Sequence, residues 1–362
     1  MRALALAVIP FAALGCARRS SGGGRTQAGS AGHLVLRGAV IAGTSAPSDV
    51  EIAGGRIIAV AAAGTLSAPL VRDLGGRFLA PAFIDSHVHL AYLPAADELA
   101  AHGVAAAVDL ASPLEFLQKH PATPRLVLSG PMLTAPAGYP LSSWGAAGYG
   151  LACPDAAAAA AAVDRLAAAG AAVIKIPLTE PPVLDDAAIA SAVARARTHQ
   201  LLVVVHALGD REAARAARLG ADILAHTPIE ALAASTIDAW RTRAVISTLG
   251  AFGGGAATID NLRRLREAGA TVVYGTDLGN TQTAAIDARE LALLSAAGLD
   301  GAAILAAGTS TPARLWGFTD LGAIAPGKAA SLLVLAADPT RDPRTLATPV
   351  AVYLDGATAW KP

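Results

Sequence analysis

The sequence has few cysteines, few aromatic residues and no excess of either charge. Two cysteines in 362 residues are too few for a framework of disulfides. The 28 basic residues equal the 28 acidic ones, so the chain lacks the electrostatic signature of a nucleic-acid-binding protein, and no nucleic-acid partner is expected. Aromatic residues make up only 4%, so alanine and the branched aliphatic residues must fill the core.

Apolar residues are abundant instead. Hydrophobic residues make up 54% and charged residues 15%, which excludes a disordered chain. The 36 glycines and 22 prolines are moderately frequent but do not form low-complexity sequence. A length of 362 residues fits two domains, or one large domain with an addition.

The first sixteen residues have the features of an export signal. Arg2 precedes a short apolar run from Leu4 to Gly15, which is too short to span a membrane as a helix. Cys16 directly follows this run, an arrangement that resembles the lipobox of bacterial lipoproteins. We therefore expect a signal peptide over 1–16, a lipid anchor on Cys16 as the only membrane attachment, and a flexible linker over 17–32. The expected location is periplasmic or membrane-anchored, and a cytoplasmic protein with an incidental cysteine is the alternative.

Both ends of the remaining chain show β-strand patterns. Near the N-terminus, Gly54-Gly55 separates two short alternating segments, as a two-residue hairpin turn does. Near the C-terminus, Asp355-Gly356 follows the apolar run Val350–Leu354 in the same way. We predict a small composite β-sandwich domain built from residues 33–80 and 323–362.

The middle of the chain alternates between helix and strand. A glycine ends a helical stretch and an apolar strand begins almost at once, for example at Gly170 and Gly220. This alternation is typical of βα units and a parallel sheet. The expected strands are Ala82–Val88, Val104–Leu110, Arg125–Ser129, Ala172–Ile176, Leu201–His206, Asp222–His226, Ala244–Thr248 and Thr271–Gly275. Their number predicts an α/β fold of the TIM (β/α)8 barrel type over residues 81–322, rather than a doubly wound sheet.

Polar side chains lie at the C-terminal ends of these strands, where a TIM barrel carries its active site. Because side chains two apart on a strand point the same way, His87 and His89 both face the barrel axis. The same alternation points Lys175 inward, where an unpaired ammonium group is costly. The ends of three further strands contribute His206, His226 and Asp277. Four imidazoles, a carboxylate and a lysine at one mouth form a ligand set suited to zinc.

These positions, in this order, resemble the amidohydrolase superfamily, in its branch of imidazolonepropionase-like and prolidase-like metal-dependent hydrolases. The matching pieces are Pro81–His89, Val173–Ile176, His206, His226, Gly275–Gly279, Thr311–Arg314, Gly322–Lys328 and Leu332–Leu335. The histidine pair alone is a weak signal, whereas the six polar positions together are a specific one. The resemblance covers about residues 33–362.

The resemblance implies a site for two zinc ions. His87 and His89 would bind the more buried ion together with Asp277, and the other two histidines would bind the second. Lys175 would be carboxylated by carbon dioxide and bridge the ions, which would turn a costly buried cation into an anionic ligand. Asp277 would also take a proton from the metal-activated water and pass it to the leaving nitrogen. The alternative is a single metal, with Lys175 in an ordinary salt bridge.

The longest strand-to-helix connection, residues 130–154, contains no charged residue and carries Tyr139, Trp144 and Tyr149. Long loops at a catalytic face are usually functional, so we expect a lid over an apolar pocket; a loop that only packs over the barrel is the alternative. Arg211 is the only evident basic residue in the strand-end loops, which argues against a strong carboxylate clamp. We therefore predict a small substrate that is neutral or apolar.

The predicted activity is hydrolysis of an amide-type C–N bond, in an amide, lactam, carbamate or dipeptide. One alternative is an Xaa-Pro-type dipeptidase, which activity on Xaa-Pro pairs would distinguish. The other is a surface lipoprotein whose degenerate barrel only binds a ligand. The intact set of six polar residues argues against that second alternative.

Overall fold

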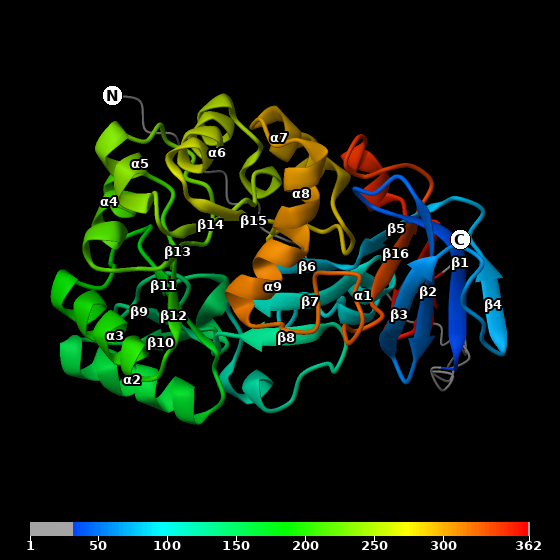
Figure 1. Cartoon of the computed structure of the whole chain (residues 1–362). Coiled ribbons are helices and arrows are strands. Elements are labelled where there is room, and N and C mark those ends of the chain that lie inside the picture. Colours follow the sequence, from blue (N-terminus) through cyan, green and yellow to red (C-terminus); the bar gives the residue numbers. More distant parts are fainter. Residues whose placement is uncertain (1–31, 361–362) are drawn as a thin grey trace, which may run out of the picture.

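The computed structural model describes residues 32–360. The predicted signal peptide over 1–16, the lipid anchor on Cys16 and nearly all of the linker lie outside these residues. Figure 1 shows a part with alternating helices and strands, and beside it a sheet formed by the two ends of the chain. The alternating part carries all six predicted site residues.

Eight parallel strands form two hydrogen-bonded groups in the middle of the chain. The first group is, in order, β6 (Phe83–Val88), β7 (Val104–Asp109) and β8 (Arg125–Leu128). The second is β11 (Val173–Pro177), β12 (Leu202–His206), β13 (Ile223–Leu224), β14 (Ala244–Ile246) and β15 (Thr271–Val273). Each predicted strand is present with small shifts at its ends, which confirms the α/β fold class.

Individual backbone hydrogen bonds connect the two groups at both of their edges. Next to β8 and β11, Ala172 N donates to Leu128 O at 2.9 Å. On the other side, His89 N donates to Leu278 O at 2.7 Å, beyond the ends of β6 and β15. The C-terminal ends of the first and last parallel strands therefore lie next to each other.

The predicted alternation of inward and outward side chains along the strands holds for β11. Val173 belongs to an apolar cluster with residues of other parallel strands, among them Val204 and Ile246. Ile174 and Ile176 instead belong to the larger core that contains the helices. Lys175, two residues after Val173, therefore shares the inner face of the strands.

Helices follow the strands along the chain and pack against them (Figure 1). They are α1 (Ala96–Ala101), α2 (Ala156–Ala168), α3 (Asp186–Thr198), α4 (Asp210–Arg218), α5 (Ala234–Trp240), α6 (Ala256–Ala268), α7 (Ala288–Ala296), α8 (Gly301–Gly308) and α9 (Ser310–Trp316). Short 3-10 helices are η1 (Leu114–Leu117), η2 (Trp144–Ala146), η3 (Gly250–Phe252) and η4 (Pro343–Ala347). Asp155 caps the alanine-rich α2 by accepting a hydrogen bond from Ala158 N at 2.8 Å. None of the helices within residues 32–360 is both long and apolar enough to cross a bilayer.

Both ends of the chain contribute strands to one eight-stranded sheet. Its order is β18-β17-β16-β5-β1-β2-β3, and β4 also pairs with β1. The strands are β1 (Leu34–Ile41), β2 (Pro47–Ala53), β3 (Arg56–Ala62), β4 (Leu70–Asp73), β5 (Phe78–Pro81), β16 (Leu332–Leu335), β17 (Ala351–Leu354) and β18 (Ala357–Trp360). The predicted turn at Gly54-Gly55 has φ values of 55° and 78°, as a hairpin turn with two left-handed residues requires. The described residues show one sheet here and do not show the second layer of a sandwich.

The connection over residues 130–154 contains secondary structure that the sequence did not predict. Within it, β9 (Met132–Thr134) and β10 (Gly150–Ala152) pair in parallel, and η2 lies between them. Strands of three residues are too short for hydrophobic periodicity to reveal. The pairing brings the two ends of the connection together and leaves its aromatic middle, around Tyr139 and Trp144, over the strand ends.

Candidate metal centre

The six predicted site residues lie at one end of the parallel strands. Their positions are His87 in β6 and His89 just after it, Lys175 in β11, His206 at the end of β12, His226 after β13 and Asp277 after β15. All are buried except His206, which is partly exposed. The sequence prediction that they share one mouth therefore agrees with their placement.

His87, His89 and Asp277 form the tightest group. One potential ligand atom from each lies within 4.8 Å of the other two. His87 Nε2 and His89 Nε2 lie 3.3 Å and 3.1 Å from Asp277 Oδ1. His87 Nδ1 donates a hydrogen bond to Ala225 O at 2.9 Å, which leaves Nε2 with a free lone pair.

Two buried ring nitrogens of this group, His87 Nε2 and His89 Nδ1, have no hydrogen-bond partner among the described residues. Buried polar atoms are normally hydrogen-bonded, so these two nitrogens need an explanation, and coordination of a metal ion is one. Imidazole nitrogens beside a carboxylate oxygen are ligands that zinc and similar divalent ions prefer. The donor set therefore fits a metal ion.

His206 and His226 lie beside this group rather than within it. The His226 ring centroid is 4.6 Å from that of His87 and 4.7 Å from that of His206. Thr248 Oγ1 is hydrogen-bonded to His226 Nδ1 at 2.9 Å, which fixes the orientation of the ring. The four imidazoles thus form a continuous cluster, with His226 connecting its two parts.

Burial determines the protonation of the cluster. Removal from water lowers the pKa of His206 to about 3, with the Lys175 ammonium contributing. The same two causes bring the pKa of His87 well below its ordinary value. For Asp277, burial raises the pKa, but the neighbouring His87 and His89 outweigh it and hold the value well below the usual range. His87, His206 and His226, whose pKa burial also lowers well below its ordinary value, are therefore neutral at pH 7, the form that binds metals.

Lys175 is buried and forms no ion pair with another side chain among the described residues. Among the described side chains, the ion-pair partners of Asp277 are His87 and His89 rather than Lys175. Burial lowers the pKa of Lys175 to about 7. A large fraction of this amine is therefore uncharged near neutral pH, which is the form that reacts with carbon dioxide.

Asp85 connects the two strand ends that carry the tightest group. Its carboxylate accepts hydrogen bonds from His87 N at 3.1 Å, from Thr276 N at 3.1 Å and from Thr276 Oγ1 at 2.6 Å. Burial raises the pKa of Asp85 to about 7. The sequence segment that matches the family includes Asp85, but no role was predicted for it. Its position two residues before His87 was the only sequence feature that could have indicated this role.

Replacing Asp85 with alanine is expected to destabilise the protein by about 3 kcal/mol, because three buried donors lose their acceptor. Thr276→Val, which removes only the hydroxyl donor, should cost about 1 kcal/mol. Urea unfolding of the two variants and the parent protein measures both values. Equal losses in the two variants would contradict this role of Asp85.

Asn280 and Glu290 fix the positions of site segments through hydrogen bonds. Asn280 Nδ2 donates to Asp277 Oδ2 at 3.1 Å. The buried Glu290 of α7 accepts hydrogen bonds from Leu249 N at 2.9 Å and Gly250 N at 2.7 Å, which fixes the segment after Thr248. Sequence reasoning missed both residues. Asn280 lies beyond the end of a predicted strand, and Glu290 contacts a segment that is distant in the chain.

Two of the three aromatic residues predicted to form a lid contact the imidazoles. The Trp144 ring lies 5.7 Å from that of His89, and the Tyr139 ring is stacked 5.7 Å from that of His206. Tyr149 instead lies deeper in the segment, where its hydroxyl donates to Ala91 O at 3.0 Å. The expectation of a lid thus applies to Tyr139 and Trp144.

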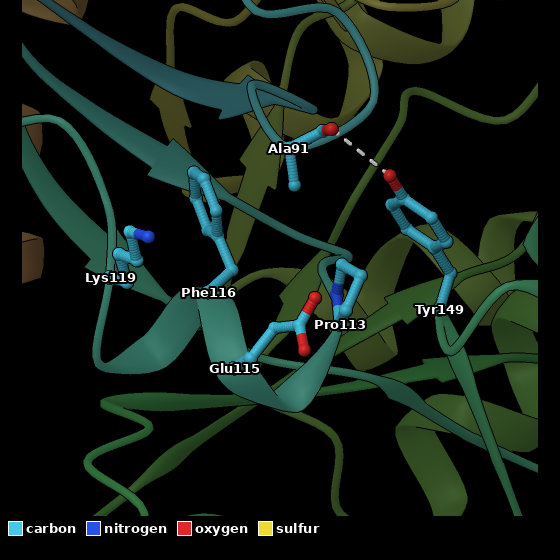
Figure 2. Close-up of a pocket in the computed structure, with 6 residues that line it drawn as sticks. All are labelled: Ala91, Pro113, Glu115, Phe116, Lys119 and Tyr149. Atoms are coloured by element: carbon cyan, nitrogen blue, oxygen red, sulfur yellow. Dashed lines mark hydrogen bonds between the residues drawn. The ribbon is translucent and has the colours of Figure 1, made fainter.

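A cavity of about 510 Å³ borders this segment at Tyr149. Its lining residues are Ala91, Pro113, Glu115, Phe116, Lys119 and Tyr149 (Figure 2). None of them is a predicted site residue. Lys119 is the basic residue of this lining, whereas Arg211, the basic residue named from the sequence, does not border the cavity. Arg211 itself lies in the first turn of α4 with an exposed side chain.

The family model of the amidohydrolases matches residues 78–358 of this chain. The chain belongs to the amidohydrolase family. This confirms the predicted class of activity, metal-dependent hydrolysis of a C–N bond. None of the curated proteins is significantly similar to the chain in sequence.

Solved structures of the same architecture cover nearly the whole chain. A candidate prolidase from Bifidobacterium longum is 24% identical, with a TM-score of 0.78 over 92% of this chain and 95% of the other. An Xaa-Pro dipeptidase with bound methionine is 20% identical, with a TM-score of 0.78 over 91% and 100%. Ochratoxinase from A. niger is 18% identical, with a TM-score of 0.73 over 91% and 96%. At these identities the likeness shows the fold.

Proposed function

We propose that the protein hydrolyses an amide-type C–N bond of a small neutral or apolar substrate, using two zinc ions held by the six predicted residues. The observation that carries this proposal is the meeting of four imidazoles, Asp277 and the buried Lys175 at one end of the parallel strands. Bound zinc would acidify a water molecule and polarise the substrate carbonyl.

Side chains of the protein would carry out the proton transfers. Asp277 is held by Asn280 Nδ2 at 3.1 Å and by its backbone hydrogen bond to His87 O at 2.8 Å, so its carboxylate has a fixed orientation. It would accept the proton of the attacking water and deliver it to the leaving nitrogen. The aromatic residues of 130–154 would limit the access of bulk water.

The finer architecture belongs to the same proposal. The hydrogen bonds at both edges of the two strand groups support one closed eight-stranded barrel over residues 81–322. The end sheet has a core of its own, which includes Leu36, Ile52 and Leu332 and supports a sandwich domain over residues 33–80 and 323–362. Export as a lipoprotein anchored at Cys16 rests on the sequence of the first sixteen residues.

Metal content tests the proposal first. We expect about two zinc equivalents per chain by elemental mass spectrometry of residues 17–362 purified without chelators, and hydrolysis in a screen of amides, lactams, carbamates and Xaa-Pro dipeptides. One equivalent would remove the bridging role from Lys175. No metal after reconstitution, with no turnover, would favour the ligand-binding lipoprotein. Hydrolysis of Xaa-Pro pairs alone would favour the dipeptidase.

Bicarbonate should promote zinc binding if Lys175 is carboxylated. Since burial lowers the pKa of Lys175 to about 7, reconstitution at pH 8 presents a mostly uncharged amine. We expect zinc uptake to rise from about one to about two equivalents when bicarbonate is added, and ¹³C-bicarbonate to give a carbamate carbon signal by NMR. Lys175→Met should show neither effect, and a signal that persists in this variant would contradict the assignment.

A further inference from the structure

Three aromatic side chains border the imidazole cluster from two segments without charged residues. Tyr139 and Trp144 come from residues 130–154, and Phe252 comes from η3 in residues 248–255. We refer to Tyr139, Trp144 and Phe252 as the aromatic arc. In a chain with only 4% aromatic residues, three around one cluster are a marked concentration.

The three rings of the aromatic arc border three of the four imidazoles, His89, His206 and His226. Trp144 lies against His89 with ring centroids 5.7 Å apart, and its ring is 6.1 Å from that of Tyr139. Tyr139 is stacked on His206 with an interplanar angle of 29°. Phe252 closes the arc, with centroids 4.8 Å from His226 and 6.2 Å from His206.

The rings of the arc are fixed but not fully covered. Trp144 Nε1 donates to the Tyr139 hydroxyl at 2.9 Å, and Glu290 anchors the backbone of Gly250 at the start of η3. All three side chains remain partly exposed. They therefore keep some accessible apolar surface beside the imidazole cluster instead of being completely packed in the core.

The charges near the arc disfavour an anionic group. Neither of its two segments contains a lysine or arginine, and Glu180, an exposed acid after β11, is the charged neighbour of Tyr139 besides Asp277. Neither segment itself offers a cation to a substrate carboxylate, and the guanidinium of Arg289, which contacts the second segment, already donates to Gly253 O at 2.9 Å. An uncharged group with a flat face would instead stack on the rings or meet their edges, as aromatic pairs prefer.

We propose that the aromatic arc binds an uncharged aryl group of the substrate beside the scissile bond, so that aryl amides and aryl carbamates are the preferred substrate class. This inference rests on the proposed hydrolysis and names the group that the enzyme selects. A saturated ring of similar size buries comparable apolar area but lacks the aromatic quadrupole, so the two kinds of ring should be distinguished.

Matched substrates test the inference by turnover. We expect kcat/KM for an amide with a phenyl group to exceed that of its cyclohexyl counterpart by about tenfold. In Trp144→Leu and in Phe252→Leu this ratio should fall to about threefold or less. Trp144→Phe keeps an aromatic ring and should retain most of the preference for the phenyl substrate. Phe116→Leu is the control, because Phe116 lines the neighbouring cavity of Figure 2 and does not belong to the arc.

Equilibrium dialysis of the same neutral amides against metal-free protein gives a readout without turnover. The phenyl compound should bind more tightly than the cyclohexyl compound, and the leucine variants of the arc should remove the difference. Equal binding of both compounds, or loss of the preference in Phe116→Leu alone, would overturn the inference. If phenyl-selective binding persists but no C–N bond is cleaved by the zinc-loaded protein, the proposed hydrolysis fails and the binding assignment stands.

Discussion

Asp277→Asn is expected to lower kcat/KM by about 10³-fold, because general acid–base catalysis contributes roughly 10² to 10⁴ and the asparagine amide cannot take up a proton at neutral pH. The substitution preserves size and leaves an oxygen that can still accept the Asn280 hydrogen bond. Steady-state kinetics of the zinc-loaded protein measures the loss. The pH profile of the residual activity should lose its acidic limb, since the group that must be ionised is gone.

A matched control separates this effect from loss of structure or metal. Asp300→Asn changes an exposed N-cap of α8 that accepts a hydrogen bond from Ala303 N at 2.8 Å, and asparagine caps helices equally well. It should leave kcat/KM and the unfolding midpoint unchanged. If Asp277→Asn retains activity within about threefold of the parent at full zinc occupancy, another group must carry the proton.

Lys175→Met is expected to raise the unfolding temperature of the metal-free protein by several degrees at pH 6 to 7. Burial lowers the pKa of Lys175 from 10.5 to about 7, so the unfolded chain binds this proton more tightly than the folded protein does. Its destabilising contribution is therefore complete below pH 7 and disappears as pH rises toward 10.5. Methionine fills similar volume without a charge and removes this contribution.

Thermal unfolding of both metal-free proteins from pH 6 to pH 10 measures the difference. We expect the advantage of Lys175→Met to shrink steadily with rising pH, while the zinc-loaded variant loses activity and one equivalent of metal. Lys119→Met, at an exposed lysine, is the control and should show no pH-dependent advantage. An unfolding temperature that falls in Lys175→Met throughout this range would contradict the buried, unpaired state of the lysine.

Much of the site could be predicted because strand geometry is local. Side chains two residues apart share a face, so His87 and His89 together, and Lys175 between two isoleucines, could be oriented without coordinates. The hairpin turn at Gly54-Gly55 was equally local, because only residues that accept positive φ suit both positions. The family pattern then tied strand ends that are far apart in the chain to one mouth.

The remaining features depend on contacts between segments distant in sequence. Asp85 bonds to Thr276, and Glu290 supports Gly250. No periodicity relates such partners, because they meet only when the strands pack side by side. The short strands β9 and β10 escaped prediction for a related reason, since three residues acquire their conformation from pairing rather than from propensity.

The sequence by itself determined the α/β class, the order of the strands and the identity of the six polar residues, because these follow from hydrophobic pattern and from motif order along the chain. The tertiary structure decided which of them form the tightest group, which imidazole nitrogens remain free, and that Lys175 lies buried away from the ion pairs of Asp277. It also brought Phe252 to the same imidazole cluster as Tyr139 and Trp144. Distances and burial arise from packing, and packing is a property of the whole fold.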